Sequence, residues 1–179
     1  LILALGMGYD LFVGPRQGFL IDRQDIQREL SDTETLAGLV IHMPKLPPAT
    51  RAALVEDHTF RLQQLRARLG IRTHAPIHSF VYQDADQKAR LMGGRHTMIA
   101  KPWLHEIHIH GTTVPHDVLA HELVHALAAE YGGPLGVSIS GASIHMGLIE
   151  GLAEAVTAPR GAYDLHTGAA ILRKSGSAP

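Results

Sequence analysis

The stretch HEIHIHGTTVPHDVLAHELVH (105–125) holds six of the thirteen histidines in the sequence and predicts the two central elements of the fold. In its first half, Ile107 and Ile109 alternate with polar residues, which is the period of two expected of a half-buried strand. His108 and His110 share the other face of that strand, and we expect this face to be solvated. The second half changes to helical spacing, so the stretch predicts a strand followed by a helix.

The helix is predicted over residues 115–131. Pro115 has the fixed φ that a first helical turn tolerates, and Asp117 places a negative charge near the positive end of the helix dipole. The sequence Gly132-Gly133-Pro134 would end the helix. Its apolar positions offer one surface for burial, and they are Val118, Leu119, Leu123, Val124, Leu127 and Ala128.

Within this helix, residues 121–125 read HELVH, an HExxH motif. His121 and His125 are four residues apart and therefore lie on one helical face, where both imidazoles can bind one ion. Glu122 is rotated by about 100° from His121, beside the ion rather than on it, where a general base for a zinc-activated water is needed. The sequence has no cysteine, so any metal must be held by His, Asp or Glu. Two of the six histidines are thus expected to do chemistry.

A third ligand is offered in the segment GLIEGLAEAV (147–156). Glu150 and Glu154 are again four residues apart and face the same side of a predicted helix. One of them can bind zinc while the other accepts a hydrogen bond from a ligand imidazole and fixes its tautomer. Gly151, next to Glu150, is expected to let this helix approach the metal helix closely.

HELVH followed by EGLAE resembles the gluzincin class of zinc metallopeptidases, in which HExxH is followed by a Glu in an E-G-x-A helix. Within that class the chain is similar to small peptidase-MA-like domains of bacterial proteins, over residues 36 to 157. The resemblance implies that Glu122 is the base and proton shuttle and that Glu154 is the outer partner of His121. It also implies the zinc ligands, which are His121, His125 and Glu150.

The order of the predicted elements indicates an α+β domain with helices packed against one sheet. The resemblance implies a zincin-like fold, in which a small twisted mixed sheet packs against the active-site helix and a following helix carries the third ligand. Besides 105–111, strands are predicted at 36–43, 77–83 and 97–100. The other predicted helices are 21–30 (capped by Asp22), 51–70 (capped by Thr50, with Phe60 toward its apolar side), 84–94, 146–157 and 164–173.

Length predicts a single domain over residues 1–179, with an N-terminal extension at 1–35 and a flexible tail at 174–179. The extension starts with nine largely apolar residues before Asp10, too few to span a bilayer. They form either a buried element or the end of a membrane helix. The second reading places the domain outside the cytoplasm, associated with a membrane, with membrane-embedded segments of the same chain as candidate partners.

Sixteen basic and seventeen acidic residues, without long runs of either sign, favour no nucleic-acid partner. The leading functional hypothesis is a zinc-dependent endopeptidase acting on peptides or proteins. The resemblance to gluzincins implies that its substrate binds along the backbone of 105–110. The alternatives are a non-catalytic extracytoplasmic module of a larger membrane protein and a metal-sensing domain. No motif identifies a group that stabilises the oxyanion, and position alone makes Tyr163, His166 and His145 candidates.

Overall fold

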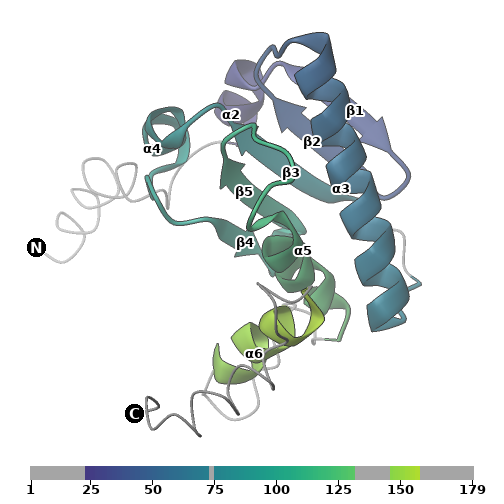
Figure 1. The fold of residues 1–179 in the computed structure, drawn as a ribbon. Coiled ribbons are helices and arrows are strands. Elements are labelled where there is room, and N and C mark those ends of the chain that lie inside the picture. Colours follow the sequence, from purple (N-terminus) through teal and green to yellow (C-terminus); the bar gives the residue numbers. More distant parts are fainter. Residues whose placement is uncertain (1–22, 73–74, 132–145, 158–179) are drawn as a thin grey trace, which may run out of the picture.

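The computed structural model describes residues 23–72, 75–131 and 146–157, and Figure 1 shows their arrangement. The described residues form an α+β fold built on a five-stranded mixed sheet. Across the sheet the strands are β1 (Asp32–Leu36), β2 (Leu39–Met43), β3 (Ile77–Tyr82), β5 (Glu106–His110) and β4 (Ile99–Lys101). The α-helices of the described part are α2 (Arg23–Glu29), α3 (Pro48–Leu69), α4 (Ala85–Met92), α5 (Leu119–Ala128) and α6 (Met146–Val156).

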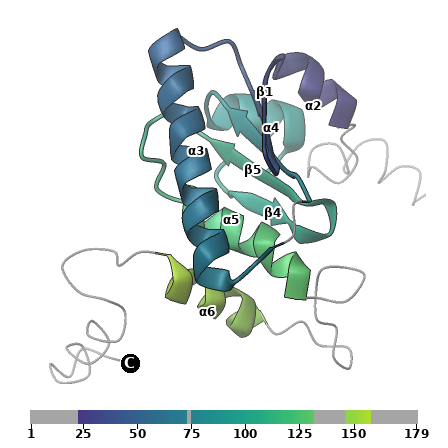
Figure 2. The same ribbon diagram turned by 90° about the vertical axis from the view of Figure 1, so that its right-hand side faces the viewer.

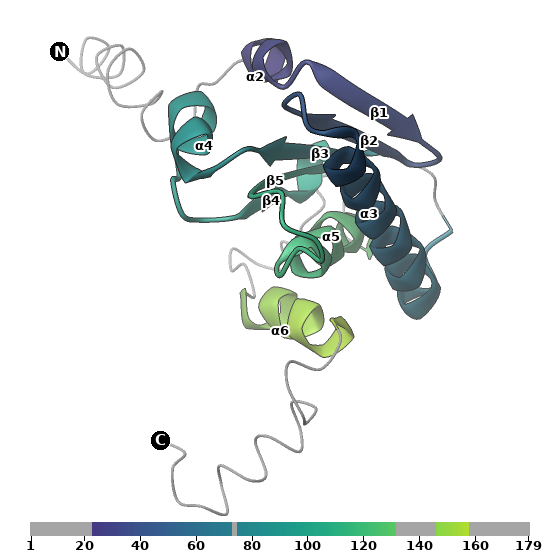
Figure 3. The ribbon, with the colours of Figure 1, turned by 45° about the horizontal axis from the view of Figure 1, so that its top comes forward.

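The helices cover both faces of the sheet, as Figure 3 shows. Helices α3 and α5 lie on one face, and α2 and α4 lie on the other. Helix α6 packs on the outer side of α5, near the lower end of α3 in Figure 2. The expected α+β class is therefore confirmed, and α5, the helix that carries HELVH, lies between the sheet and α6.

Strands β2, β3 and β5 are parallel to one another, whereas the two outer strands, β1 and β4, run antiparallel to their neighbours. The predicted strand 36–43 is wrong in one respect, because a two-residue turn at Ala37-Gly38 divides it into the end of β1 and the whole of β2. Gly38 has a φ of +76°, which glycine adopts without strain. Helix α2 and strand β1 lie almost entirely within the stretch 1–35, and β1 is a full member of the sheet.

Helix α3 begins at Pro48 and ends at Gly70, whose left-handed conformation lets its N–H bond the Arg66 carbonyl. The predicted end of this helix is confirmed, but the predicted cap is wrong. Thr50 already lies inside the helix, because proline suits its first turn. Phe60, expected on the apolar side, is 56% exposed because it is out of phase with the buried positions Leu54, Leu62 and Leu65.

Helix α5 is shorter at its start than predicted, since it begins at Leu119. Pro115 and Asp117 precede the helix, so they belong to the loop from β5 and not to a first helical turn. Leu119, Leu123 and Val124 are completely buried in the core between α5, α3 and the sheet. Each such side chain contributes about 2 kcal/mol to stability, which fixes the rotation of α5 about its axis.

The opposite face of the sheet carries a row of stacked rings beneath α2 and α4. His42, Phe80 and His108 are direct neighbours on β2, β3 and β5, with ring centroids 4.7 Å and 4.8 Å apart. The expectation that His108 lies on a solvated face is wrong, because only 1% of His108 is exposed. A strand in the middle of a sheet that is covered on both faces buries both of its side-chain rows.

His108 is also tied into a buried polar chain that joins the sheet to α2. Its Nδ1 lies 3.0 Å from the Tyr82 hydroxyl, and its Nε2 lies 3.4 Å from Oε2 of Glu106. The other carboxylate oxygen of Glu106 pairs with Nε of Arg23 at 3.1 Å. Each buried polar group in this chain therefore has a partner, which explains how the apolar interior tolerates it.

A second buried histidine, His58 on α3, makes stability depend on pH. Its Nδ1–H donates to the Leu54 carbonyl at 2.8 Å, and in the neutral ring Nε2 accepts from the Ser79 hydroxyl at 2.9 Å. Burial lowers the pKa of His58 to about 4. The unfolded chain binds this proton below about pH 6.5 and the folded chain does not, so stability falls as pH drops from 6.5 toward 4.

We expect metal-free wild-type protein to lose roughly 2 kcal/mol more unfolding free energy between pH 7 and pH 4.5 than the variant His58→Gln. Urea titrations in the presence of a chelator at the two pH values measure this difference. His96→Gln is the matched control, because His96 is exposed and should keep the wild-type pH dependence. An unchanged pH dependence in His58→Gln would contradict a neutral buried His58.

Several expectations concern residues outside the described part of the chain. These are the apolar start, the Asp22 cap, the Gly132-Gly133-Pro134 helix stop, the predicted helix 164–173 and the tail 174–179. Among the described helices, none combines the length and the apolar composition needed to cross a bilayer.

Candidate metal centre

The two histidines of HELVH lie together on the surface of α5 that faces away from its buried leucines. Their Nε2 atoms are 2.9 Å apart, and their rings meet edge to face. The i, i+4 spacing produces this arrangement directly, because one helical turn brings both side chains to the same face. Burial lowers the pKa of His125, so its ring is neutral and has a lone pair for a cation.

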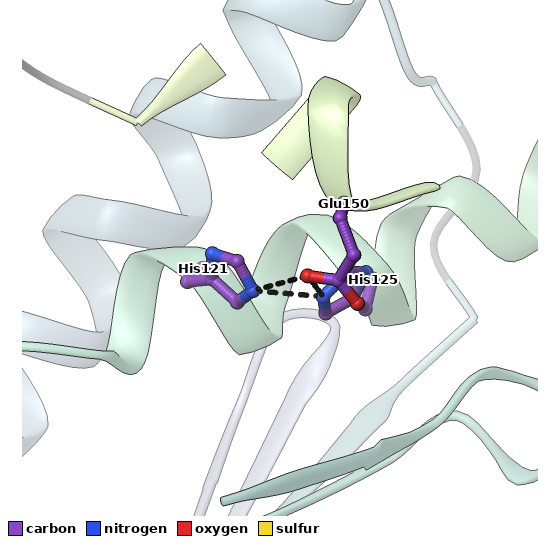
Figure 4. Close-up of side chains that lie close together, drawn as sticks. All are labelled: His121, His125 and Glu150. Carbon is purple, nitrogen blue, oxygen red and sulfur yellow. Dashed lines mark hydrogen bonds and ion pairs between the residues drawn. The ribbon is translucent and has the colours of Figure 1, made fainter. Parts of the chain in front are cut away.

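Glu150 on α6 completes the group. Its Oε2 lies 3.2 Å from Nε2 of His121 and 3.5 Å from Nε2 of His125, and Figure 4 shows the three side chains converging. Ligand atoms about 2 Å from a tetrahedral zinc ion are separated from one another by about 3.3 Å. The three side chains therefore fit a single metal ion, as their donor atoms all lie within 4.8 Å of one another.

Helix α6 is held against α5 by packing and against α3 by a hydrogen bond. Ala153 is completely buried in the core cluster, and the Arg68 guanidinium donates to the Val156 carbonyl at 2.7 Å. The expectation that Gly151 permits a close approach of the helices is wrong. Gly151 is exposed, and a Cβ atom there would meet nothing within 4 Å. The small residue at the interface is Ala153, two positions later and on the other side of the helix.

Glu154 lies where the sequence predicts the outer partner of a ligand. Its Oε1 is 3.3 Å from Nδ1 of His121. This is the ring nitrogen that does not face the candidate metal group, a name used here for His121, His125 and Glu150. The distance suits an ion pair, although the alignment is not that of a hydrogen bond. A ligand imidazole whose Nδ1–H donates to a carboxylate has Nε2 free to bind a cation.

Glu122 lies beside the group and is 6% exposed. Burial raises the pKa of its carboxyl to about 7, while His121 and Lys88 lower it and Glu150 raises it further. A carboxylate with a pKa close to neutrality accepts a proton and returns it with little energetic cost on either side. Glu122 also lines the same cleft as His121, His125 and Glu150.

The group opens into a cleft of about 470 Å³ between α5, α6 and the β4 side of the sheet. It is lined by Ile99 and Ala100 of β4 and by Thr97 and Met98, which precede that strand. Pro102 and Trp103 of the short helical turn η3 (Pro102–Leu104) also line it. Helix α6 contributes Ile149 next to Glu150. A concave, largely apolar site with a few convergent polar groups is the usual form of a small-molecule or peptide site.

The expectation that the backbone of 105–110 binds substrate is wrong. Strand β5 pairs with β3 along its whole length and with β4 over residues 106–108, so the backbone of 106–108 is paired on both sides. The strand at the edge of the sheet next to the cleft is β4, which pairs only with β5 among the described strands. Sequence periodicity shows which residues form a strand but does not show which strand lies at the edge.

Lys88 on α4 is a residue of this region that the sequence does not reveal. Its side chain is completely buried, and Nζ donates to the carbonyls of Gly94 and Thr97 at 2.6 Å each. These two bonds hold the irregular segment that leads into β4 and the rim of the cleft. Burial lowers the pKa of Lys88 to about 8, against the attraction of Glu122. In sequence, Lys88 looks like an ordinary exposed helical lysine.

Three of the residues considered in sequence, Tyr163, His166 and His145, lie outside the described part of the chain, so no oxyanion-stabilising residue is assigned. Comparisons of the chain with protein-family models, with curated proteins and with solved structures gave no match.

Proposed function

We propose that the protein is a zinc-dependent hydrolase of the gluzincin type that cleaves peptide bonds. One observation carries this proposal: two histidines and a glutamate converge on a point at which one ion fits, directly beside a buried carboxyl with a pKa near 7. Two neutral imidazoles and one carboxylate are a common ligand set of catalytic zinc, which keeps a fourth position for water or substrate. Bound zinc would lower the pKa of a water and polarise a carbonyl group.

The protein's own groups would perform the proton transfers. Glu122 would accept a proton from the attacking water and later give it to the leaving amine, for which its raised pKa is suited. Glu154 would keep the His121 ring in the tautomer that presents Nε2. A substrate in extended conformation would lie along the edge of β4 that no described strand pairs with, because Met98, Ile99 and Ala100 of that region line the cleft.

We expect the zinc-loaded protein to cleave members of a mixed peptide library, and expect 1,10-phenanthroline to reduce the rate by about 100-fold or more. Adding zinc after removal of the chelator should restore the rate. Mass spectrometry of the products measures cleavage, and elemental analysis measures the metal in the same samples.

Two results would contradict the proposal in different ways. Cleavage that persists in fully metal-free protein would exclude a metal-dependent reaction. One zinc per chain without cleavage of any peptide would favour the alternative, a non-catalytic module that keeps the metal group for binding.

A further inference from the structure

The walls of the cleft are apolar, whereas the metal group and Glu122 at its base are polar or charged. Apart from the metal group and Glu122, its described lining carries no charged side chain, and most of it is apolar. The apolar part comprises Met98, Ile99, Ala100, Pro102, Trp103 and Ile149. A charged substrate side chain placed here would lose its water without gaining an opposite charge, which is costly. An apolar side chain would gain from the same burial.

Trp103 is the largest of these residues and is 55% exposed at the mouth of the cleft. It lies on the turn η3, directly after the edge strand β4, so it follows the strand along which an extended substrate would lie. A half-exposed indole in a concave site is typical of residues that carry binding energy, because covering it removes a large apolar surface from water. The neighbouring Leu104 is 48% exposed but does not line the cleft.

We propose that Trp103, together with Ile149 of α6, forms a subsite that selects substrates with an aromatic or large aliphatic side chain beside the cleaved bond. The same subsite discriminates against acidic side chains, for which the described lining offers no lysine or arginine. This inference rests on the proposed hydrolase function in so far as the bound peptide is a substrate. The selectivity of the subsite, however, is a property of binding. It can therefore be measured without turnover.

The sequence supplies its own reporter for this measurement, because Trp103 is its single tryptophan. The probes are peptide hydroxamates that share one backbone and carry phenylalanine, leucine, glycine or aspartate at the same position. The zinc-chelating group is common to all four, so differences in affinity report the side chain. Titration into the zinc-loaded protein should change the tryptophan emission with the two apolar probes, which should bind at least about 10-fold more tightly than the aspartyl probe.

Variants separate Trp103 from its surroundings, with affinities measured by calorimetry because Trp103→Ala removes the fluorophore. Trp103→Ala should weaken binding of the phenylalanyl probe by about 10-fold or more and leave the glycyl probe unchanged. Trp103→Phe should keep most of the preference, and Leu104→Ala should keep all of it. Both replaced side chains are about half exposed, so the fold should survive, and circular dichroism checks that it does.

Equal affinities for all four probes, no binding of any probe, or an unchanged preference in Trp103→Ala would overturn the subsite. The binding preference and peptide cleavage are measured separately, so either one can be present without the other. A side-chain preference without cleavage of any peptide would leave the subsite in place and refute the hydrolase. Cleavage without a side-chain preference would support the hydrolase and refute the subsite.

Discussion

Replacing Glu122 by glutamine should leave zinc bound and lower kcat/KM for peptide cleavage by about 10²- to 10⁴-fold, the range for loss of a positioned general base. Glutamine has the shape of glutamate but cannot take a proton from water. The side chain is buried beside the metal group and is not one of its three donors. The change therefore removes the proton acceptor and leaves the ligand set intact.

The stability of the Glu122→Gln variant should equal or slightly exceed that of the wild type, because burial opposes the charged form of this carboxyl and raises its pKa. Cleavage rates, zinc content and thermal unfolding are measured on the same preparation. Glu56→Gln is the matched control, since Glu56 is exposed on α3 and should retain full activity. Wild-type activity in Glu122→Gln would exclude the proposed mechanism, and loss of zinc would show that Glu122 is a ligand.

Replacing Glu150 by alanine should weaken zinc binding by well over 100-fold, more than the 10- to 100-fold loss expected for an outer partner. The Glu150 carboxylate lies 3.2 Å and 3.5 Å from the two Nε2 atoms, so its loss leaves His121 and His125 as the remaining donors of the described group. Its side chain is about half exposed, and the unfolding free energy of the metal-free protein should change little. Zinc stoichiometry after dialysis and competition with a fluorescent chelator measure the affinity.

Glu154→Ala is the paired test, because Glu154 is one helical turn away and meets the opposite side of the His121 ring. It should weaken zinc binding by about 10- to 100-fold and leave one zinc per chain at saturating metal. The reverse pattern, with a larger loss in Glu154→Ala than in Glu150→Ala, would exchange the two roles. Equal and negligible effects of both would place the third ligand outside α6.

More of the candidate site than of the fold can be predicted from the sequence, because the residues of the site are related by local spacing along two helices. The positions of His121, Glu122 and His125 relative to one another depend only on helical geometry, and the structure has them as predicted. Glu150 and Glu154 are likewise placed by one turn of α6. The segment between the two helices carries no such constraint, so their contact had to be inferred from the ligand chemistry.

Two of the wrong predictions concern contacts between segments distant in sequence, whereas the misplaced helix starts and the divided strand 36–43 are local errors. His108 alternates with apolar residues as a solvated strand residue would, yet α4 covers that face of the sheet and buries it. The backbone of 105–110 is expected from sequence to bind substrate, but residues 106–108 pair with β4.

The sequence by itself determined the α+β class, most of the helices and strands, and the local spacing of the candidate ligands on α5 and on α6. Periodicity of 3.6 or 2 residues and capping glycines act between near neighbours, so they can be read along the chain. Only the tertiary structure decided which strand lies at the sheet edge, which polar residues are buried and which side chains line the cleft. These depend on pairing and packing between distant segments, for which the chain carries no local signal.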